Sequence, residues 1–366
     1  MDRVEEYKAK VDKIRRFMDK NGLKGVLLTT QHNFSWLSCG GDNQIIRGRE
    51  IGFVSFFITG DKVYLVTNNI EMPRVLNEEV LGVPVEQYEY VWTEDGVKNM
   101  LGDIVVDGKV ASDANFPGTI NMESEIGLLR TPLLAPEIER YRKLARMCEI
   151  SLNETMKEIE VGMEEYEIQG IIGGKLLSKG IYPVVLLVGT DERIFNYRHP
   201  MPTEKKLERY CMVVICAQRW GLILNMTRLV YFGKLTDEIK ERYEALHIVD
   251  MAYITATRVG NRIKDIFEVG KVAYKSVGYE GEEKKHFQGG TCGYLTREQG
   301  LDPYNAYEIS DGEIFAHNPT ITGTKIEDSI MIKNGRYEVL TLSDDWPSRE
   351  MEHNGIVLKR PEILQR

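Results

Sequence analysis

The chain has 366 residues, of which 42% are hydrophobic and 28% charged, and its formal net charge is −9 at pH 7. This length exceeds that of one typical domain, so we expect two domains, with one or three as alternatives. An acidic chain without a basic stripe repels nucleic acid and anionic membranes, and neither is expected as a partner. No stretch reaches the roughly 18 apolar residues of a membrane-spanning helix, and the N-terminal MDRVEEYKAK lacks the apolar core of a signal peptide. We therefore expect a cytoplasmic protein whose five cysteines are reduced.

The first third of the chain mixes helical and strand patterns. Apolar residues recur at three- and four-residue steps from Val4 to Met18, which predicts a helix ending at Asn21-Gly22. Further helices are expected over 71–80 and 94–101, and strands over 25–30, 51–59, 62–68 and 85–92. Gly60-Asp61 joins the second and third of these strands as a hairpin. The pattern predicts a compact α/β domain over 1–131.

The prolines of TPLLAPEIER (131–140) interrupt the pattern and predict a linker, with a second domain over 132–366. The predicted helices of this domain cover 138–152, a segment that ends near 179, 236–257 and 263–277. The predicted strands are a short buried one at 184–188, a hairpin of 211–217 and 221–233 with a tight turn at 218–221, and short ones near 313–317, 326–332 and 337–341, before a polar tail. Helices followed by long antiparallel strands indicate an α+β fold. The absence of GxGxxG after a strand and of GxxxxGK[ST] excludes Rossmann and P-loop sites.

Six segments of the second half resemble segments of a known protein family. In chain order they are Asn196-Tyr-Arg-His199-Pro-Met-Pro202-Thr, LERYCMVVICA, ILNMTR, HFQGGTCGY, FAHNP and TKIED. Their order and spacing resemble the pita-bread family that includes prolidase, aminopeptidase P, methionine aminopeptidase and creatinase. The resemblance covers most of residues 135–345, and residues 1–131 resemble the smaller N-terminal domain that prolidase, aminopeptidase P and creatinase carry. It implies a pita-bread hydrolase fold and a homodimer.

The metal ligands of that family are mostly replaced in this chain. Placed on the family pattern, the two ligating Asp residues become Cys216 and Asn225, the ligating His becomes Gly290, and the first ligating Glu becomes Asn318. Only the last ligating Glu is kept, as Glu327. Two divalent cations bring four positive charges, which one carboxylate and a thiol that could ionise cannot neutralise in a buried pocket. We therefore expect no metal at this site and no other cofactor.

The resemblance also implies roles for the retained residues. Creatinase, the metal-free member of the family, works with a His and the terminal Glu. This implies His199 as general acid/base and Glu327 as the residue that orients a cationic or NH-rich group of the substrate. Both could equally be relics of the fold. Arg297 stands where the peptidases bind substrate with a His, so it could clamp a carboxylate or form a surface salt bridge with Glu298 or another nearby acid. Lys325 lies two residues before Glu327 on the same strand face and could pair with it.

Other polar residues of these segments are candidates for binding substrate. Asn225 and Asn318 can donate and accept hydrogen bonds to a neutral polar ligand. His286 and Gln288 stand beside the glycines of HFQGGTCGY, whose backbone could approach a ligand or simply turn. Cys216 could be a nucleophile, although a buried inert thiol is the commoner outcome in an apolar strand.

Three further residues have alternative roles. Arg228 is expected to support the fold through a buried pair, and His317 to be structural. His32 lies in the N-terminal domain, a loop of which reaches the partner subunit's active site in this family, so contact with substrate is possible.

These residues are compatible with three functions. The first is a metal-independent hydrolase that acts on a C–N bond of a small peptide-like or guanidino-type substrate. The second is a non-catalytic protein that binds a small molecule or short peptide in the same pocket. The third is an Xaa-Pro metallopeptidase with a rearranged metal site.

Overall fold

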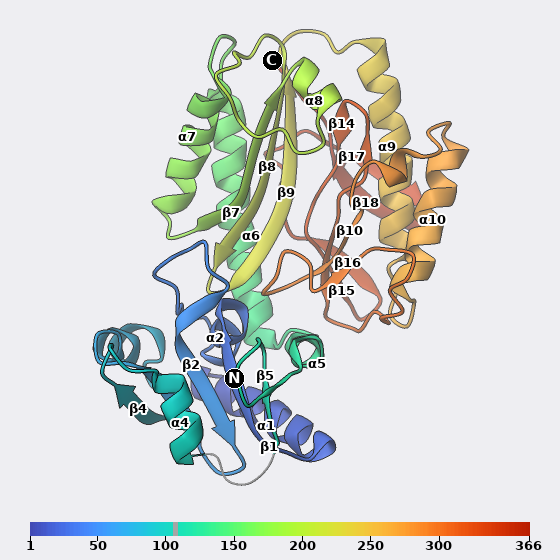
Figure 1. Cartoon of the computed structure of the whole chain (residues 1–366). Helices are drawn as coiled ribbons and strands as arrows, with labels where there is room; N and C mark the ends of the chain where they lie inside the picture. Colours follow the sequence, from blue (N-terminus) through green and yellow to red (C-terminus); the bar gives the residue numbers. More distant parts are fainter. Residues whose placement is uncertain (105–108) are drawn as a thin grey trace. The chain divides into compact units, whose positions relative to one another are not determined.

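The computed structural model describes residues 1–104 and 109–366, and its contacts divide the chain into two compact units. The first comprises Met1–Arg140 with Trp220–Leu222, and the second comprises Tyr141–Arg219 with Ile223–Arg366 (Figure 1). The boundary at 131/132 stays a prediction of where the linker lies.

The first unit is built on a six-stranded mixed sheet in the order β4-β3-β2-β1-β5-β6. Its elements are α1 (Arg3–Asn21), β1 (Leu23–Thr30), α2 (Gln31–Leu37), β2 (Ile51–Thr59), β3 (Val63–Asn68), α3 (Met72–Arg74), the π-helix η1 (Val75–Glu79), β4 (Glu86–Tyr90), α4 (Gly96–Ile104), β5 (Lys109–Ser112), β6 (Ile120–Asn121), α5 (Glu123–Gly127) and the 3₁₀ helix η2 (Leu128–Arg130). Strands β1, β5 and β6 run parallel, whereas β2 is antiparallel to β1. The carboxyl ends of these three strands and the start of β2 therefore share one edge.

Local sequence signals account for the first helix and the first hairpin. Asp2 and Glu5 form a capping box at the start of α1, and Gly22 ends the helix with φ of 63°. The antiparallel pair β2–β3 confirms the hairpin that the sequence predicts around Gly60-Asp61.

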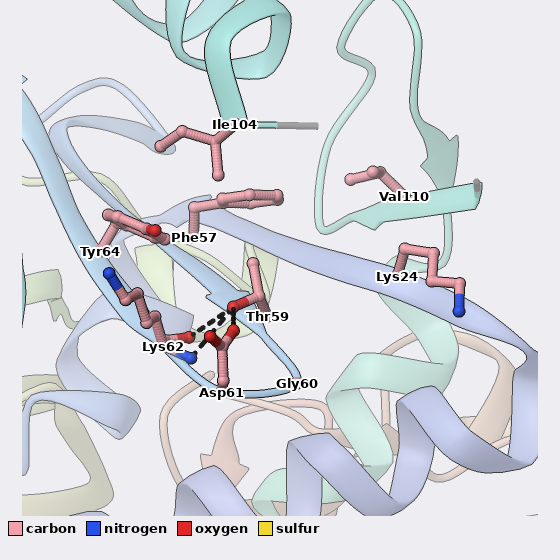
Figure 2. A pocket seen from close by; sticks show the side chains of 9 residues that line it. All are labelled: Lys24, Phe57, Thr59, Gly60, Asp61, Lys62, Tyr64, Ile104 and Val110. Carbon is pink, nitrogen blue, oxygen red and sulfur yellow. Dashed lines mark hydrogen bonds between the residues drawn. The ribbon is translucent and has the colours of Figure 1, made fainter. Parts of the chain in front are cut away.

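A pocket lies at the turn of that hairpin (Figure 2). The Thr59 hydroxyl donates to Asp61 Oδ1 at 2.9 Å, and the Lys62 N–H donates to the Thr59 hydroxyl at 3.0 Å. Phe57 and Tyr64 contribute aromatic rings to its wall. The candidate site residues named from the second half all belong to the second unit, so this pocket is not the predicted site.

The second unit contains two larger sheets, in the orders β19-β9-β8-β7 and β11-β10-β12-β15-β16, and two hairpins, β13–β14 and β17–β18. Its helices are α6 (Ala135–Glu158, which begins in the first unit), α7 (Glu165–Leu177), α8 (Glu192–Asn196), α9 (Asp237–Ala256), α10 (Ile263–Ser276) and η3 (Glu282–Lys284). Its strands are β7 (Tyr182–Thr190), β8 (Tyr210–Arg219), β9 (Leu222–Tyr231), β10 (Gly289–Cys292), β11 (Gln299–Gly300), β12 (Ile314–His317), β13 (Thr320–Ile321), β14 (Thr324–Lys325), β15 (Ile330–Lys333), β16 (Arg336–Val339), β17 (Ser348–His353), β18 (Ile356–Pro361) and β19 (Leu364–Gln365). Helix α7 packs on β7, and α9 packs on α10 (Figure 1). Helix α9 also packs on β12–β14. This is the α+β arrangement that the sequence predicts.

The β8–β9 hairpin confirms the predicted tight turn and sets a register that matters for the site. Trp220 and Gly221 have φ of 54° and 75°, the positive values that a two-residue type I′ turn requires. Because only these two residues separate the strands, Cys216 lies opposite Asn225, and cross-strand partners point to the same face.

Three sequence-based expectations for this unit were wrong in detail. The strand expected as short and buried at 184–188 extends over Tyr182–Thr190 and is only partly buried in its first half, because β7 is a sheet edge. The expected strand 326–332 is regular only from Ile330. The expected polar tail contains β17, β18 and β19, whose alternating polar residues are typical of strands with one solvated face.

Among the described residues, none of the helices combines the length and apolar character that crossing a membrane requires. All five cysteines are free and buried.

Glu313 is a buried acid of the second unit with an elevated pKa. Its side chain is 2% exposed, and the Tyr307 hydroxyl donates to its Oε1. Burial raises the pKa of Glu313 from 4.5 to about 7. The folded state therefore holds a proton that the unfolded state releases between these values, and stability is lost as pH rises through this window.

Replacement of Glu313 by Gln should remove this loss. A shift from 4.5 to about 7 corresponds to roughly 3 kcal/mol. The free energy of unfolding of the variant, relative to that of wild type, should therefore be higher at pH 8 than at pH 4 by about this amount. Urea unfolding at the two pH values measures the change. Glu308→Gln, at a side chain that is 60% exposed, serves as the control. A Glu313→Gln effect that does not vary with pH would contradict the assignment.

Candidate functional site

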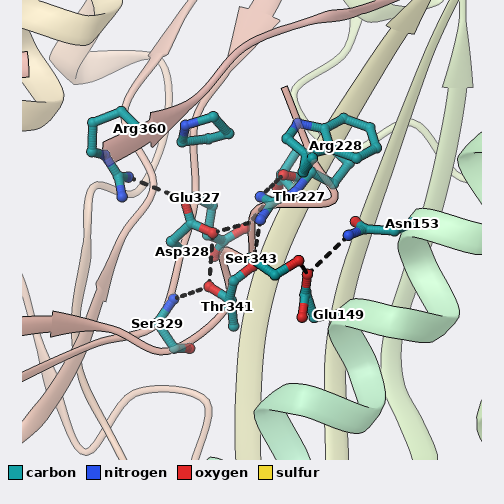
Figure 3. Close-up of polar contacts among 12 residues, drawn as sticks. Glu149, Asn153, Thr227, Arg228, Glu327, Asp328, Ser329, Thr341, Ser343 and Arg360 are labelled. Atoms are coloured by element: carbon teal, nitrogen blue, oxygen red, sulfur yellow. Dashed lines mark hydrogen bonds and ion pairs between the residues drawn. The ribbon is translucent and has the colours of Figure 1, made fainter. Parts of the chain in front are cut away.

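Glu327 lies in the segment between β14 and β15 and is 1% exposed. Its carboxylate accepts a hydrogen bond from the Thr227 hydroxyl at 2.9 Å and from Arg297 Nη2 at 3.0 Å, and Lys325 Nζ lies 3.2 Å from it. Figure 3 shows Glu327 beside Thr227 of β9. Burial alone would raise the pKa of Glu327, but Lys325 and Arg297, helped by the hydrogen bond from Thr227, lower it. The retained carboxylate is therefore ionised and already paired with two cations.

Arg297 is held by the same carboxylate. The sequence left open a substrate clamp or a salt bridge with a nearby acid. A salt bridge is present, but it is buried rather than at the surface, with 13% of the Arg297 side chain exposed, and its acid is Glu327. Glu298 accepts a hydrogen bond from the Tyr294 N–H at 2.8 Å. The role of Arg297 towards substrate stays a prediction.

Two histidines lie beside this ion cluster. His199 follows α8 and is exposed, whereas His286 is 8% exposed, and their ring centroids are 5.0 Å apart. Burial and then the charge of Lys325 lower the pKa of both imidazoles, that of His286 to about 3. Both rings are therefore neutral near pH 7, and the exposed His199 ring can accept a proton.

The face of β8 and β9 adds a thiol and an amide. Cys216 is buried, and burial followed by the charge of Glu327 raises the pKa of its thiol to about 12. An un-ionised thiol is a weak nucleophile and a poor metal ligand. Neither polar atom of the buried Asn225 amide has a hydrogen-bond partner among the described residues, and the same holds for Asn318 Oδ1. Unpaired buried amides are costly, so a polar group of a ligand would be favourable there.

Gln288 has a full set of partners within the fold. Its amide oxygen accepts from the hydroxyls of Tyr253 and Tyr274, and its amide nitrogen donates to the carbonyls of Glu283 and His286. Gln288 therefore positions the loop that carries His286. Its predicted contact with substrate is not favoured by these bonds.

A buried ion network lies next to Glu327 in sequence, and Figure 3 shows its members Arg228, Asp328 and Arg360. Asp328 lies 2.9 Å from Arg228 Nη2 and 3.2 Å from Arg360 Nη2, and Arg360 Nε donates to Asp250 at 2.6 Å. All four side chains are at most 1% exposed. This confirms the buried pair expected for Arg228. The role of Arg360 was not predicted, because its segment reads as a polar tail.

The residues around Glu327 do not fit a dimetal centre. Two full positive charges already flank the carboxylate, and the thiol opposite Asn225 is not ionised. Three side chains of the His, Cys, Asp or Glu type whose ligand atoms lie within 4.8 Å of one another could hold a metal ion. Within residues 1–104 and 109–366, such a group is found in the first unit and not around Glu327. Burying further positive charge beside Arg297 and Lys325 would be very costly.

Comparisons with known proteins agree with this fold. The model of metallopeptidase family M24 matches residues 139–334. The chain is 23% identical over 350 residues to the Xaa-Pro dipeptidase of Pyrococcus horikoshii, a match that covers 89% of this chain and 95% of that protein. It is 24% identical over 231 residues to an uncharacterized peptidase of Staphylococcus aureus, which covers 60% of this chain and 65% of the peptidase.

Among solved structures, the prolidase of Thermococcus sibiricus is similar over 100% of both chains, with a TM-score of 0.79 and 18% identity. The N-terminal domain of the FACT complex subunit SPT16 from chickpea is similar over 93% of this chain and 96% of that one, with a TM-score of 0.72 and 11% identity. At these identities the structures establish the fold alone.

Proposed function

Because this chain belongs to metallopeptidase family M24, we propose that it acts through the residues around Glu327 in its second unit, without a dimetal centre. It would hydrolyse a C–N bond in a small, peptide-like compound that carries a carboxylate, with His199 as the proton acceptor. The observation that carries this proposal is the pairing of Glu327 with both Arg297 and Lys325.

The charge of the site supports an anionic substrate. Arg297 and Lys325 each contribute one positive charge and Glu327 one negative charge, so this group carries a net charge of +1. His199 and Cys216 are neutral near pH 7, as their pKa shifts indicate. A buried site with net positive charge favours a carboxylate and repels a guanidinium. Of the substrates left open by the sequence, a short peptide is therefore favoured over a guanidino compound.

The proposed reaction uses only these side chains. His199 takes a proton from water as the water oxygen attacks the carbonyl carbon of the scissile amide. Lys325 and Arg297 would stabilise the negative charge that forms on the carbonyl oxygen. His199 then returns the proton to the leaving nitrogen as the C–N bond breaks, which completes general acid–base catalysis.

Replacement of His199 by Gln should lower kcat/KM by about 10²- to 10⁴-fold, the usual contribution of a general base. Stability should change little, because the side chain is exposed. The assay compares dipeptides, Xaa-Pro dipeptides and their C-terminal amides, and the amides should be poorer substrates because they lack the carboxylate. His353→Gln, at a histidine that bonds to Thr255, is the control. Equal activity of wild type and His199→Gln would refute the role of His199.

A non-catalytic binding function is the second candidate. It is favoured by burial, because Glu327, Lys325 and His286 are between 1% and 8% exposed. It is also favoured by the unpaired amide of Asn225, which suits a ligand that is held rather than cleaved. Thermal stabilisation by dipeptides without turnover would select this function over hydrolysis.

A metallopeptidase with a rearranged site is the third candidate, and the name of the Pyrococcus relative favours an Xaa-Pro substrate for it. Metal analysis of the purified chain tests it. Stoichiometric metal that Cys216→Ala removes, together with Xaa-Pro cleavage that a chelator abolishes, would support this candidate and overturn the metal-independent one.

A further inference from the structure

A second group of polar side chains gathers at one edge of the sheet in the first unit. His32 is the second residue of α2, directly after β1, and Glu123 begins α5, two residues after β6. Glu50 directly precedes β2, and Asp113 directly follows β5. The parallel strands β1, β5 and β6 end at the edge where β2 begins (β1, β2 and β5 are labelled in Figure 1). The carboxyl ends of parallel strands are common positions for ligand sites.

Three of these residues converge on one point. One ligand atom each of His32, Glu50 and Glu123 lies within 4.8 Å of the other two. The His32 side chain is 3% exposed, whereas both glutamates are exposed. The arrangement offers one buried nitrogen and two carboxylates that open to solvent.

The hydrogen bonds of His32 determine which nitrogen keeps a lone pair. The Thr30 hydroxyl lies 2.6 Å from Asp113 Oδ2, and a carboxylate can only accept, so the hydroxyl proton is committed to Asp113. His32 Nε2 lies 3.1 Å from the same hydroxyl oxygen and must therefore be the donor. This leaves the lone pair on Nδ1, which has no hydrogen-bond partner within the described parts of the chain. A chain of carboxylate, hydroxyl and imidazole of this kind orients metal-binding histidines.

The charged side chains around His32, Glu50 and Glu123 would together neutralise one divalent cation. Glu50, Glu123 and Asp113 contribute three negative charges, and Arg130, which donates to Asn33 at 2.5 Å, contributes one positive charge. The sum is −2. The net charge here is negative, whereas the net charge around Glu327 is positive.

We propose that His32 Nδ1 and one oxygen each of Glu50 and Glu123 bind a divalent transition-metal ion of the zinc type. Three protein ligands with a solvent position match zinc sites that keep an open coordination position. Imidazole with carboxylates also suits cobalt, which binds more weakly in the usual order of affinities and reports coordination geometry by its colour. The ion joins the segments before β2, after β1 and after β6, and so stabilises this edge of the first unit.

Titration of the chelator-treated full chain with Zn²⁺ and Co²⁺ tests the site. We expect one ion per chain, a higher Tm with zinc, and a Co²⁺ spectrum of low coordination number. The double variant Glu50→Gln/Glu123→Gln, which changes only exposed side chains, should weaken binding by more than about 100-fold, and Asp113→Asn by about 10- to 100-fold. Glu125→Gln, on the same helix α5 and exposed, is the matched control.

Each outcome decides the proposal. Absence of binding in wild type, or equal binding by wild type and the double variant, overturns it, as does a Co²⁺ spectrum identical to that of the hydrated ion. Binding that Cys216→Ala removes while the double variant keeps it would place the metal in the second unit instead. Loss of binding in the double variant, with binding kept by Cys216→Ala and Glu125→Gln, supports the site. This result does not depend on whether His199 is catalytic.

Discussion

Replacement of Asp328 by Asn should lower the free energy of unfolding by about 3–5 kcal/mol, the usual cost of breaking a buried ion pair. Asp328 is the acid shared by Arg228 and Arg360, and none of the three side chains is exposed. The amide keeps the shape of the side chain but leaves Arg228 without its acid and Arg360 with Asp250 alone. Uncompensated charge in a low-dielectric interior is the reason for the large effect.

Urea unfolding measured by circular dichroism and tryptophan fluorescence would test this expectation. Asp344→Asn is a matched control, because Asp344 pairs with Lys359 but is 89% exposed. Exposed pairs contribute about 0–1 kcal/mol, so this variant should resemble wild type. Equal effects at the two positions would mean that the network around Asp328 is not a buried, charged one.

By resemblance the family's ligating His falls on Gly290, and placing a His there should disrupt the second unit rather than build a peptidase site. Gly290 has φ of 147°, and a Cβ there would lie 2.0 Å from the carbonyl oxygen of Gln299 on the paired strand β11. This contact is with backbone, so no rotamer relieves it. We expect Gly290→Ala, the smallest such change, to cost more than about 3 kcal/mol, in the range of severe steric changes.

Gly278→Ala separates the steric effect from the effect of backbone conformation. Gly278 also has a positive φ, of 85°, but a Cβ there meets nothing within 4 Å. Its replacement should cost about 1 kcal/mol, the strain of a left-handed residue alone. Comparison of the two Tm values, and of metal content in Gly290→His, provides the readout. A stable Gly290→His variant that binds two metal ions would contradict both this expectation and the proposed metal-independent site.

Much of the fold follows from local patterns. Helix α1 and the β2–β3 and β8–β9 hairpins could be predicted, because turn chemistry and periodicity act between residues close in sequence. The six segments of the second half were identified by their resemblance to the pita-bread family. The resemblance to the family places Cys216 and Asn225 at ligand positions, and this placement needs only the sequence. If this placement holds, the site lacks the carboxylates that usually balance the charge of two metal ions.

The partners of the remaining charges were decided only by the tertiary structure. Arg297 and Thr227 meet Glu327 across 30 and 100 positions of sequence, and Arg360 meets Asp328 from a segment that looked like a tail. His32 likewise meets Glu50 and Glu123 only because β1 and β6 end, and β2 begins, at one edge of the sheet. Ionic pairing depends on distance and burial in space, which periodicity and spacing along the chain do not encode.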